Sequence, residues 1–313
     1  MTEILDIGVP SGRTLTAGVG LAGGGTLSAD RTFTVAVPQI NGFRLTLTTA
    51  LPVTTADVTG ATTIYLTPYK GGMIALYDGA AWALYSSAEI SLALGTLTSG
   101  LPYDVFAYNN AGTLTLELLA WTNGTTRATA LARTNGVWLK TGDLTRRYVG
   151  TLYTTSTTAT EDSEAKRFVF NADNRARRSM RVLEPVDFWT YSSETMRAAN
   201  NNTANRIQFV VGLNEDGVEA TVQTFGNNGD GVTRRSVVAI GLDSTSVASS
   251  AGIYGSYLST AAYGQLVARY AGYPGIGFHF LQWLERGGPG VSQTWYGDDG
   301  GDTQAGIVGS ILS

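Results

Sequence analysis

The sequence contains no cysteine and a single histidine, His279. The absence of cysteine excludes disulfides, thiolate zinc sites and cysteine nucleophiles. Any serine–histidine or histidine–metal chemistry would have to use His279. This residue lies in an alternating run, where it shares one face with Leu281 and Trp283, and the chain has no Gly-x-Ser-x-Gly motif. We therefore expect a structural histidine, and predict that the chain is no enzyme and needs neither a cofactor nor a metal.

Charged residues are also scarce, at 15 % of the chain, where about a quarter is usual. Three lysines stand against 18 arginines, and the net charge is −4. A net negative charge is a poor match for phosphate backbones, so we expect no nucleic-acid partner. Arginine is less strongly hydrated than lysine and forms bidentate ion pairs, which suits contacts between domains or subunits.

Long apolar runs are missing as well, since no stretch approaches 18 consecutive apolar residues. The first ten residues contain Glu3 and Asp6 but no basic segment ahead of an apolar one. The sequence therefore predicts neither a membrane span nor a signal peptide. We expect a protein that is made in a cytoplasm and has no membrane partner.

What the chain does have is residues that form strands and turns: 43 % hydrophobic residues, 39 glycines, 15 tyrosines and abundant threonine. Alternating runs are separated by pairs such as Asp78-Gly79, Asn123-Gly124 and Asn135-Gly136, which are strong hairpin signals. The predicted fold class is therefore all-β. One short helix is expected at residues 87–94, with a serine cap and Glu89 in its first turn.

We predict three regions: a short N-terminal arm at 1–37, a central sandwich-like or barrel-like β domain at 38–181, and a jelly-roll-like C-terminal β domain at 182–313. The central domain ends in a basic connector, 166–181. The predicted strands are 43–48, 62–66, 73–77, 103–108, 113–121, 146–154, 206–212, 218–224, 236–242, 265–270 and 278–284.

The arm is expected to contain two short strands, at 13–16 and 31–35, around a glycine-rich segment. Strands this short are not stable alone in water, so they need other copies of the chain or another protein. Gly18, Gly20 and Gly23 match the spacing of a dinucleotide-binding loop, but a β-like run follows them instead of the helix that would receive a pyrophosphate. We therefore interpret these glycines as a turn.

Residues 13–35, RTLTAGVGLAGGGTLSADRTFTV, resemble a recurrent motif of the tail-fibre proteins of tailed bacteriophages. The stretch from about Thr67 to Arg181 resembles a domain of fibre-like phage structural proteins, through LTSGLPYDVF at 97–106 and AKRFVFN at 165–171. The two cover roughly half the chain. The resemblance implies a virion component, synthesised in the bacterial host cytoplasm, that is commonly a homotrimer.

Three functions follow from these observations. The first is a tail fibre or fibre-like subunit that binds other virion proteins and, as one option, a host surface glycan or protein. The second is a trimeric capsid decoration protein, or head fibre, that stabilises the head. The third is a tailspike-type glycan depolymerase using paired carboxylates, either Glu215-Asp216 or the cluster Asp298, Asp299 and Asp302. The last cluster is also a candidate Ca²⁺ site, although solvated turns are the simpler interpretation of both. Host, receptor, copy number and position on tail or head are left open.

Arginines and aromatic residues are the candidate contact sites. For the arginines of the connector, the alternative is that they form ion pairs with the flanking acidic residues. For the aromatic residues, the alternative is that they fill the core or a trimer axis. The candidates for partner binding are Arg13, Leu21, Arg31, Arg175, Arg177, Arg178 and Arg181, and those for a receptor or subunit contact are Tyr270, Tyr273, Trp283, Trp295 and Tyr296.

Overall fold

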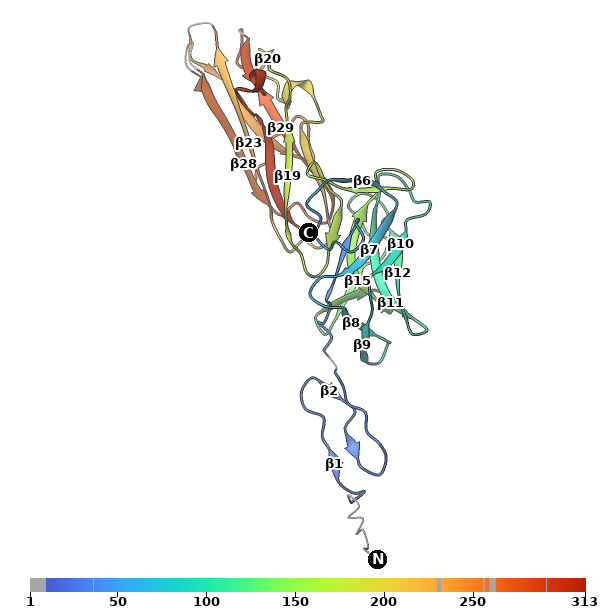
Figure 1. Ribbon diagram of the computed structural model, residues 1–313. Coiled ribbons are helices and arrows are strands. Elements are labelled where there is room, and N and C mark those ends of the chain that lie inside the picture. Colours follow the sequence, from blue (N-terminus) through green and yellow to red (C-terminus); the bar gives the residue numbers. More distant parts are fainter. Residues whose placement is uncertain (1–9, 36, 230–231, 256, 259–262, 291) are drawn as a thin grey trace, which may run out of the picture.

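The computed structural model describes residues 10–35, 37–229, 232–255, 257–258, 263–290 and 292–313. Within these ranges the chain consists of β-strands and two 3-10 turns, η1 (Ala199–Asn201) and η2 (Asp299–Gly301), and contains no α-helix. The all-β prediction is confirmed. Figure 1 shows a thin arm that leads into a central lobe, beside which lies an elongated C-terminal lobe. None of the described segments is a helix that could cross a membrane.

The arm folds as two interleaved pairs of very short strands. β1 (Thr14–Leu15) pairs with β3 (Gly25–Thr26), and β2 (Leu21–Ala22) pairs with β4 (Thr34–Val35), both antiparallel. The two predicted strands therefore pair with the glycine-rich segment between them and not with each other. The first nine residues of the predicted arm lie outside the described residues.

The central lobe contains a six-stranded sheet, a three-stranded sheet and the hairpin β8–β9. The six-stranded sheet has the order β12-β11-β15-β14-β13, with β18 also on β15, and the small sheet has the order β10-β7-β5. Their inner faces enclose one apolar core. The strands are β5 (Phe43–Thr46), β7 (Thr63–Pro68), β8 (Met73–Tyr77), β9 (Trp82–Ser86), β10 (Ile90–Ala93), β11 (Pro102–Asn110), β12 (Thr113–Ala120), β13 (Leu131–Thr134), β14 (Val137–Lys140), β15 (Asp143–Tyr153) and β18 (Val169–Asn171).

The helix predicted at residues 87–94 is wrong. This segment contains β10, which pairs antiparallel with β7. Glu89 does not act as a first-turn residue, because its carboxylate accepts bonds from Thr49 Oγ1 at 2.5 Å, Ala50 N at 2.6 Å and Thr67 Oγ1 at 2.5 Å. The tertiary pairing of an eight-residue segment overrides its local capping signal.

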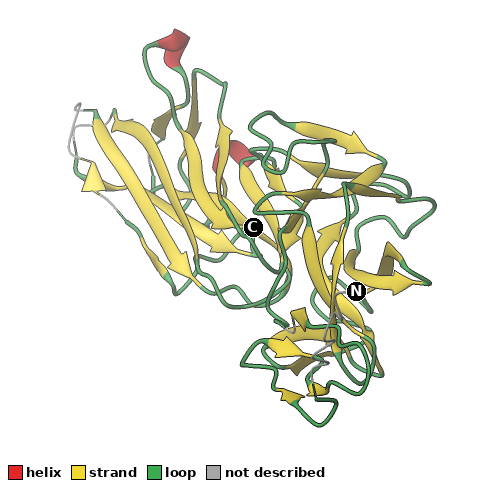
Figure 2. Cartoon of the chain, turned by 60° about the horizontal axis from the view of Figure 1, so that its bottom comes forward, coloured by secondary structure: helices red, strands yellow, loops and turns green. Residues whose placement is uncertain are grey.

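The C-terminal lobe is a sandwich of two seven-stranded sheets (Figure 2). The first has the order β19-β31-β23-β28-β26, with β30 joining β20 to the far end of β23. The second has the order β21-β29-β22-β17-β16-β6, with β25 on the other side of β29. Strands of both sheets are β6 (Val58–Ala61), β16 (Thr160–Asp162), β17 (Lys166–Arg167), β19 (Arg177–Leu183), β20 (Phe188–Tyr191), β21 (Arg197–Ala198), β22 (Arg206–Val211), β23 (Val218–Asn228), β25 (Val237–Leu242), β26 (Gly252–Ile253), β28 (Gly264–Gly272), β29 (Gly277–Arg286), β30 (Gln293–Tyr296) and β31 (Gly306–Leu312); β24 (Arg234–Arg235) and β27 (Tyr257–Leu258) form a separate pair.

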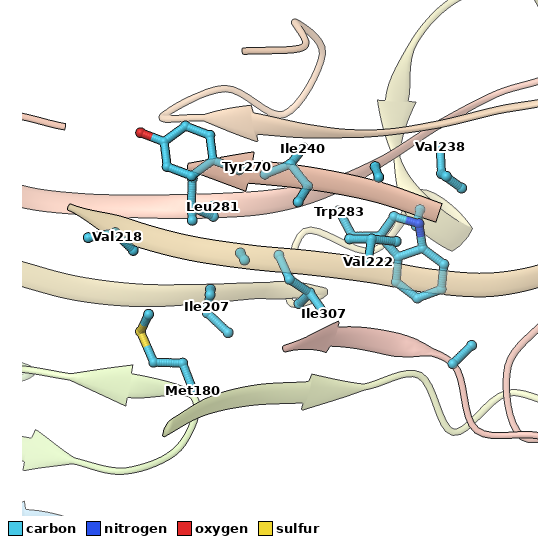
Figure 3. Close-up of a cluster of buried hydrophobic side chains, with 14 of the residues drawn as sticks. Met180, Ile207, Val218, Val222, Val238, Ile240, Tyr270, Leu281, Trp283 and Ile307 are labelled. Atoms are coloured by element: carbon cyan, nitrogen blue, oxygen red, sulfur yellow. The ribbon is translucent and has the colours of Figure 1, made fainter. Parts of the chain in front are cut away.

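The core of this sandwich takes alternate residues from both sheets. Val218, Ala220 and Val222 of β23 point inward, and the residues between them are exposed or half-buried. They meet Leu281 and Trp283 of β29, which are both fully buried (Figure 3). The period of two in the sequence is therefore the signature of a half-buried sheet, as predicted.

The two lobes share a sheet. β6, β16 and β17 precede the predicted boundary at residue 181, yet they extend the sheet of the C-terminal lobe, because β17 pairs in parallel with β22. The predicted boundary at residue 181 falls inside β19, whose seven residues pair with β31. Residues 166–181 are therefore not a free connector: they contain β17, β18 and most of β19.

Candidate functional site

The arm carries apolar side chains at its surface. Leu21 and Val35, partners in the β2–β4 pair, are 45 % and 44 % exposed. Phe33 and Leu15 are exposed to a similar degree. A ribbon only two strands wide offers no second layer to cover them. These side chains are available to another chain.

The two arginines of the arm differ in their contacts. Arg31 donates from Nε to the carbonyl of Thr26 at 2.6 Å, and its guanidinium covers Gly25. It therefore braces the arm internally. Arg13 is exposed, and its backbone carbonyl accepts a bond from Leu27 N at 2.8 Å. Arg13 and Leu21 stay the better candidates for a partner contact.

Arg178 is buried between the lobes. Its Nη2 lies 2.8 Å from the carbonyl of Thr54 and 3.1 Å from Oδ2 of Asp162. Oδ1 of the same carboxylate accepts a bond from Arg167 at 3.1 Å. Arg44 lies close by, and burial, together with the charge of Arg178, lowers its pKa to about 10. A single buried carboxylate thus pairs with both Arg167 and Arg178, and the bond from Arg178 to Thr54 fastens β19 to the central lobe.

The other three arginines of the predicted connector also find partners inside the chain. Arg175 binds both Glu215 and Asp216. Arg181 pairs with Glu164 at 2.8 Å on the surface. Arg177 donates to Ser310 Oγ at 2.7 Å, and its side chain is 67 % exposed. Of the four candidates Arg175, Arg177, Arg178 and Arg181, Arg177 presents the most of its side chain to solvent. A contact with another protein stays a prediction for all four.

A second buried network joins the lobes, and no motif in the sequence predicts it. Arg127 donates to Oδ2 of Asp104 at 2.7 Å and to the carbonyl of Gly212 at 2.6 Å, and lies 4.5 Å from the ring of Trp121. Burial raises the pKa of Asp104, although Arg127 and Thr151 oppose it. Burial likewise raises the pKa of the Tyr148 hydroxyl. The residues are scattered over the sequence, so only the fold brings them together.

The junction between the lobes is tightly packed around Gly212. A Cβ at this position would lie 2.1 Å from the hydroxyl oxygen of Tyr148 and 2.6 Å from the ring of Phe170. Close by, the ring of Phe278 stacks on Tyr153 with centroids 4.3 Å apart. Beside this contact, a cavity of about 470 Å³ opens between the lobes. It is lined by Arg127, Ala130, Leu131, Trp138, Leu213, Asn214, Glu215 and Ile276.

The five aromatic candidates do not form one patch. Trp283 and Trp295 are fully buried and Tyr270 is 3 % exposed, so all three belong to the core. Tyr273 is 66 % exposed and borders a groove of about 430 Å³, together with Arg177 and Glu219. Tyr296 lies in a different cluster. The alternative that these residues fill the core therefore holds for three of the five.

Tyr296 contacts two aromatic residues that sequence reasoning missed. Phe188 lies across the strand pair from it, with ring centroids 6.3 Å apart, and Tyr263 lies 5.3 Å away. Phe188 begins β20, in which the exposed Phe188 and Thr190 alternate with the less exposed Trp189 and Tyr191. The residue types do not show this alternation, because Phe188 and Trp189 are both aromatic, so the sequence does not indicate which of the two is exposed.

His279 is held as a structural residue. It is 4 % exposed, its Nδ1 lies 2.7 Å from Oδ2 of Asp243, and its ring packs against Phe209. Oδ1 of Asp243 accepts a bond from Phe280 N at 2.9 Å. One carboxylate therefore fixes both the imidazole and the backbone of β29 next to it. The ring has little access to solvent.

The candidate acids are arranged as turns. Both Glu215 and Asp216 are engaged by Arg175, so neither is a free acid or base. Asp298 accepts backbone bonds from Gly301 and Thr303 through its carbonyl, and Asp299 and Gly300 form η2. Within the described part of the chain, no group of three or more acidic or histidine side chains is arranged to hold a metal ion.

Comparisons with known proteins give no close relative. No protein-family model matches the chain, and no curated protein does. Among solved structures, the chain is similar to the mosquito-larvicidal Cry4Aa toxin of Bacillus thuringiensis (8 % identity, TM-score 0.21, 82 % of this chain and 51 % of the toxin) and to a Cry1Da tryptic core variant from the same organism (7 %, 0.17, 81 % and 48 %). It is also similar to the infectious bursal disease virus Gx strain structure (11 %, 0.15, 84 % and 82 %). The chain spans about half the length of the two toxins. At these TM-scores none of the three likenesses carries a functional argument.

Proposed function

We propose that this chain is a structural subunit of a tailed-bacteriophage virion, a tail fibre or fibre-like protein that docks through its N-terminal arm and presents its C-terminal lobe outward. The observation that carries the proposal is the contrast in burial along the chain. The arm exposes Leu15, Leu21, Phe33 and Val35, whereas the lobes enclose two complete cores. A segment of this kind becomes stable when another chain covers it.

The proposal includes assembly into a homotrimer. Three arms around one axis would bury the apolar side chains that a single ribbon exposes, and they would do so with identical contacts in each copy. The chain that follows the arm is held by the body, because Arg147 donates to the carbonyls of Pro38 and Ile40 at 2.9 Å each. A load on the arm is therefore transmitted to the buried sheet of the central lobe.

Mass and virion location test the proposal. Light scattering of the purified chain should give three times the 33.0 kDa mass of the monomer. Virions produced with the intact protein should carry it, and virions produced with a variant lacking residues 1–37 should not. Monomeric protein at micromolar concentration would contradict the trimer, and normal incorporation of the shortened variant would contradict docking through the arm.

Labelled intact protein in cryo-electron microscopy of the virions distinguishes tail from head. Density at the tail supports the fibre role, whereas density on the capsid surface would identify a decoration protein.

A further inference from the structure

Three aromatic rings form an exposed cluster on the C-terminal lobe. Tyr296 lies between Phe188 and Tyr263, and the ring planes are inclined to it by 50° and 53°. Phe188 is 57 % exposed and Tyr263 68 % exposed. Tyr296 thus contacts both of the other rings, which are the more exposed, and the cluster of these three residues is called the aromatic trough below.

The sheet fixes this arrangement. Phe188, Tyr296 and Phe225 are directly opposite one another on β20, β30 and β23, so they project from the same face. Their neighbours Trp189 and Trp295 project from the other face into the core, which holds the strands in register. Phe225, the partner of Tyr296, lies seven positions along β23 from Val218 at the junction end. Seven residues span about 23 Å at the usual rise of a strand. The trough therefore lies well away from the junction of the lobes.

Carboxylates flank the trough without cations to balance them. The neighbouring Asp187 carboxyl, together with burial, raises the pKa of Asp298. Burial, the Tyr263 hydroxyl and the charge of Asp299 raise the pKa of Tyr296 to about 12. Among the described residues, no lysine or arginine forms an ion pair with Asp187, Asp298 or Asp299. The local potential is therefore negative.

Other aromatic faces of the molecule already hold a cation of the chain itself. The guanidinium of Arg197 lies 3.6 Å from the centroid of Tyr191, and that of Arg146 lies 3.8 Å from the centroid of Tyr108. No such contact with a lysine or arginine is present at the three rings of the trough in the described part of the chain. The trough thus combines exposed aromatic rings with nearby carboxylates. Among the described residues, no lysine or arginine of the chain itself occupies its ring faces.

We propose that the trough formed by Phe188, Tyr263 and Tyr296 binds an organic ammonium group. Ring faces attract a cation through their quadrupoles, and the acids at the rim add charge-assisted attraction. The group would be a quaternary ammonium or the protonated amine of an amino sugar, since both present a cation on an apolar frame. The inference rests on the proposed function for its biological meaning, because attachment requires a group carried on a host surface.

Saturation-transfer NMR on the intact protein tests this inference with choline, D-glucosamine and N-acetyl-D-glucosamine as probes. We expect transfer to one or both ammonium compounds at millimolar concentration and none to the neutral acetylated sugar. Stronger binding of choline identifies a quaternary ammonium as the source, and stronger binding of glucosamine identifies an amino sugar. Lack of transfer to both ammonium probes, or equal transfer to the acetylated sugar, overturns the inference.

Variants locate the binding. Phe188→Ala and Tyr263→Ala should each weaken binding about tenfold, and Tyr263→Phe should retain it because the ring remains. Tyr273→Ala is the matched control, since Tyr273 is equally exposed but lies beyond the far end of β28. Equal loss in this control, or unchanged binding in both alanine variants of the trough, contradicts the assignment.

The oligomer mass of each variant separates this inference from its main alternative. If Phe188→Ala or Tyr263→Ala changes the mass, the trough is a contact between subunits and the inference is overturned. Failure of ammonium binding with an intact trimer and normal virion incorporation leaves the proposed function standing. Loss of incorporation in the variant without the arm, with ammonium binding retained, supports both.

Discussion

The arm and the body consist of similar alternating sequences but reach opposite states. β2 has two residues, both exposed, and pairs with one strand. β23 has 11 residues, alternates between buried and less buried positions, and pairs with β28, β30 and β31. Alternation therefore specifies a strand, but only length and a facing sheet turn it into a core. Substitutions should be costly in the body and nearly silent in the arm.

The largest effect is expected for Trp283→Ala. Trp283 is fully buried between the two sheets of the C-terminal lobe, and removing a buried aromatic ring costs about 3–5 kcal/mol. Urea unfolding should show this loss. Tyr254→Ala, at a position 49 % exposed, should stay within about 0.5 kcal/mol of the wild type. Similar losses in both variants would contradict the assignment of the core.

Asp162→Asn should be nearly as damaging. The substitution leaves Arg167 and Arg178 buried without their shared carboxylate, and removing one partner of a buried ion pair costs about 3–5 kcal/mol. Glu164→Gln is the matched control, because its pair with Arg181 is exposed and such pairs contribute about 0–1 kcal/mol. Thermal denaturation compares the two variants; equal shifts would contradict the assignment of Asp162 as the shared partner of two buried arginines.

Gly212→Ala should have a smaller effect that is confined to the junction. The new methyl group would overlap the Tyr148 hydroxyl and the Phe170 ring, and such overpacking typically costs about 1–3 kcal/mol. Gly217→Ala has room for its Cβ, whose nearest neighbour is 3.5 Å away, and should be tolerated. Amide exchange should increase in β17 and β22 of the first variant only; protection unchanged there would be evidence against tight packing.

Acidification should change the stability of the two lobes in opposite directions, through Glu117 in the central lobe and Glu285 in the C-terminal lobe. Burial alone would raise the pKa of Glu117, but the bonds from Lys140 and Arg146 outweigh it and lower the pKa. Its contribution to stability is present above the ordinary value of 4.5 and is lost as pH falls through the lowered pKa. Burial raises the pKa of Glu285 despite its bonds to Trp189 and Arg197. The contribution of Glu285 is present below 4.5 and is lost as pH rises through the raised pKa.

Amide exchange measured from pH 6 down to pH 3 checks this difference. Glu117 of β12 pairs with Lys140 of β14 and with Arg146 of β15. On acidification, the amides of β12 and β14 should therefore lose protection before those of β29. The variant Glu117→Gln should remove the acid sensitivity of β12. An earlier loss of protection in β29 would contradict the assigned directions.

The smallest effect on the fold is expected from removing the arm. A chain that starts at Pro38 keeps the carbonyls that Arg147 binds, so the unfolding free energy of the body should change by at most about 0.5 kcal/mol. Urea unfolding of the shortened chain at a concentration where it is monomeric is the measurement. A body that fails to fold would show that the arm belongs to the core.

The strands of the body could be predicted from the sequence because their alternation is long. The predicted strand at 73–77 has the bounds of β8, and the predicted strands at 103–108 and 278–284 lie inside β11 and β29. Two other segments failed for physical reasons. β10 is only four residues long, and β19 carries four arginine and methionine side chains whose burial depends on partners elsewhere. Tertiary pairing decides such segments, and local pattern does not.

The candidate site was harder to predict than the fold. Composition identified arginine as the contact residue, and Arg175 and Arg178 do join segments far apart in the chain, Arg178 through the carbonyl of Thr54. The aromatic prediction selected Trp283 and Trp295, which are core residues, and missed Phe188. Alternation says which residues share a face, but not which face is covered. That requires knowing which sheet packs on which.

The position of β31 has a consequence for how the protein is made. β31 lies between β19 and β23 in its sheet, and Leu183 pairs with Gly306. During synthesis β19 and β23 therefore leave the ribosome long before the strand that fills the gap between them. Contacts so distant in sequence close slowly, and open strand edges attract other chains in the meantime. Nascent copies translated side by side should thus be at risk of exchanging this strand, and slower translation should not relieve that risk.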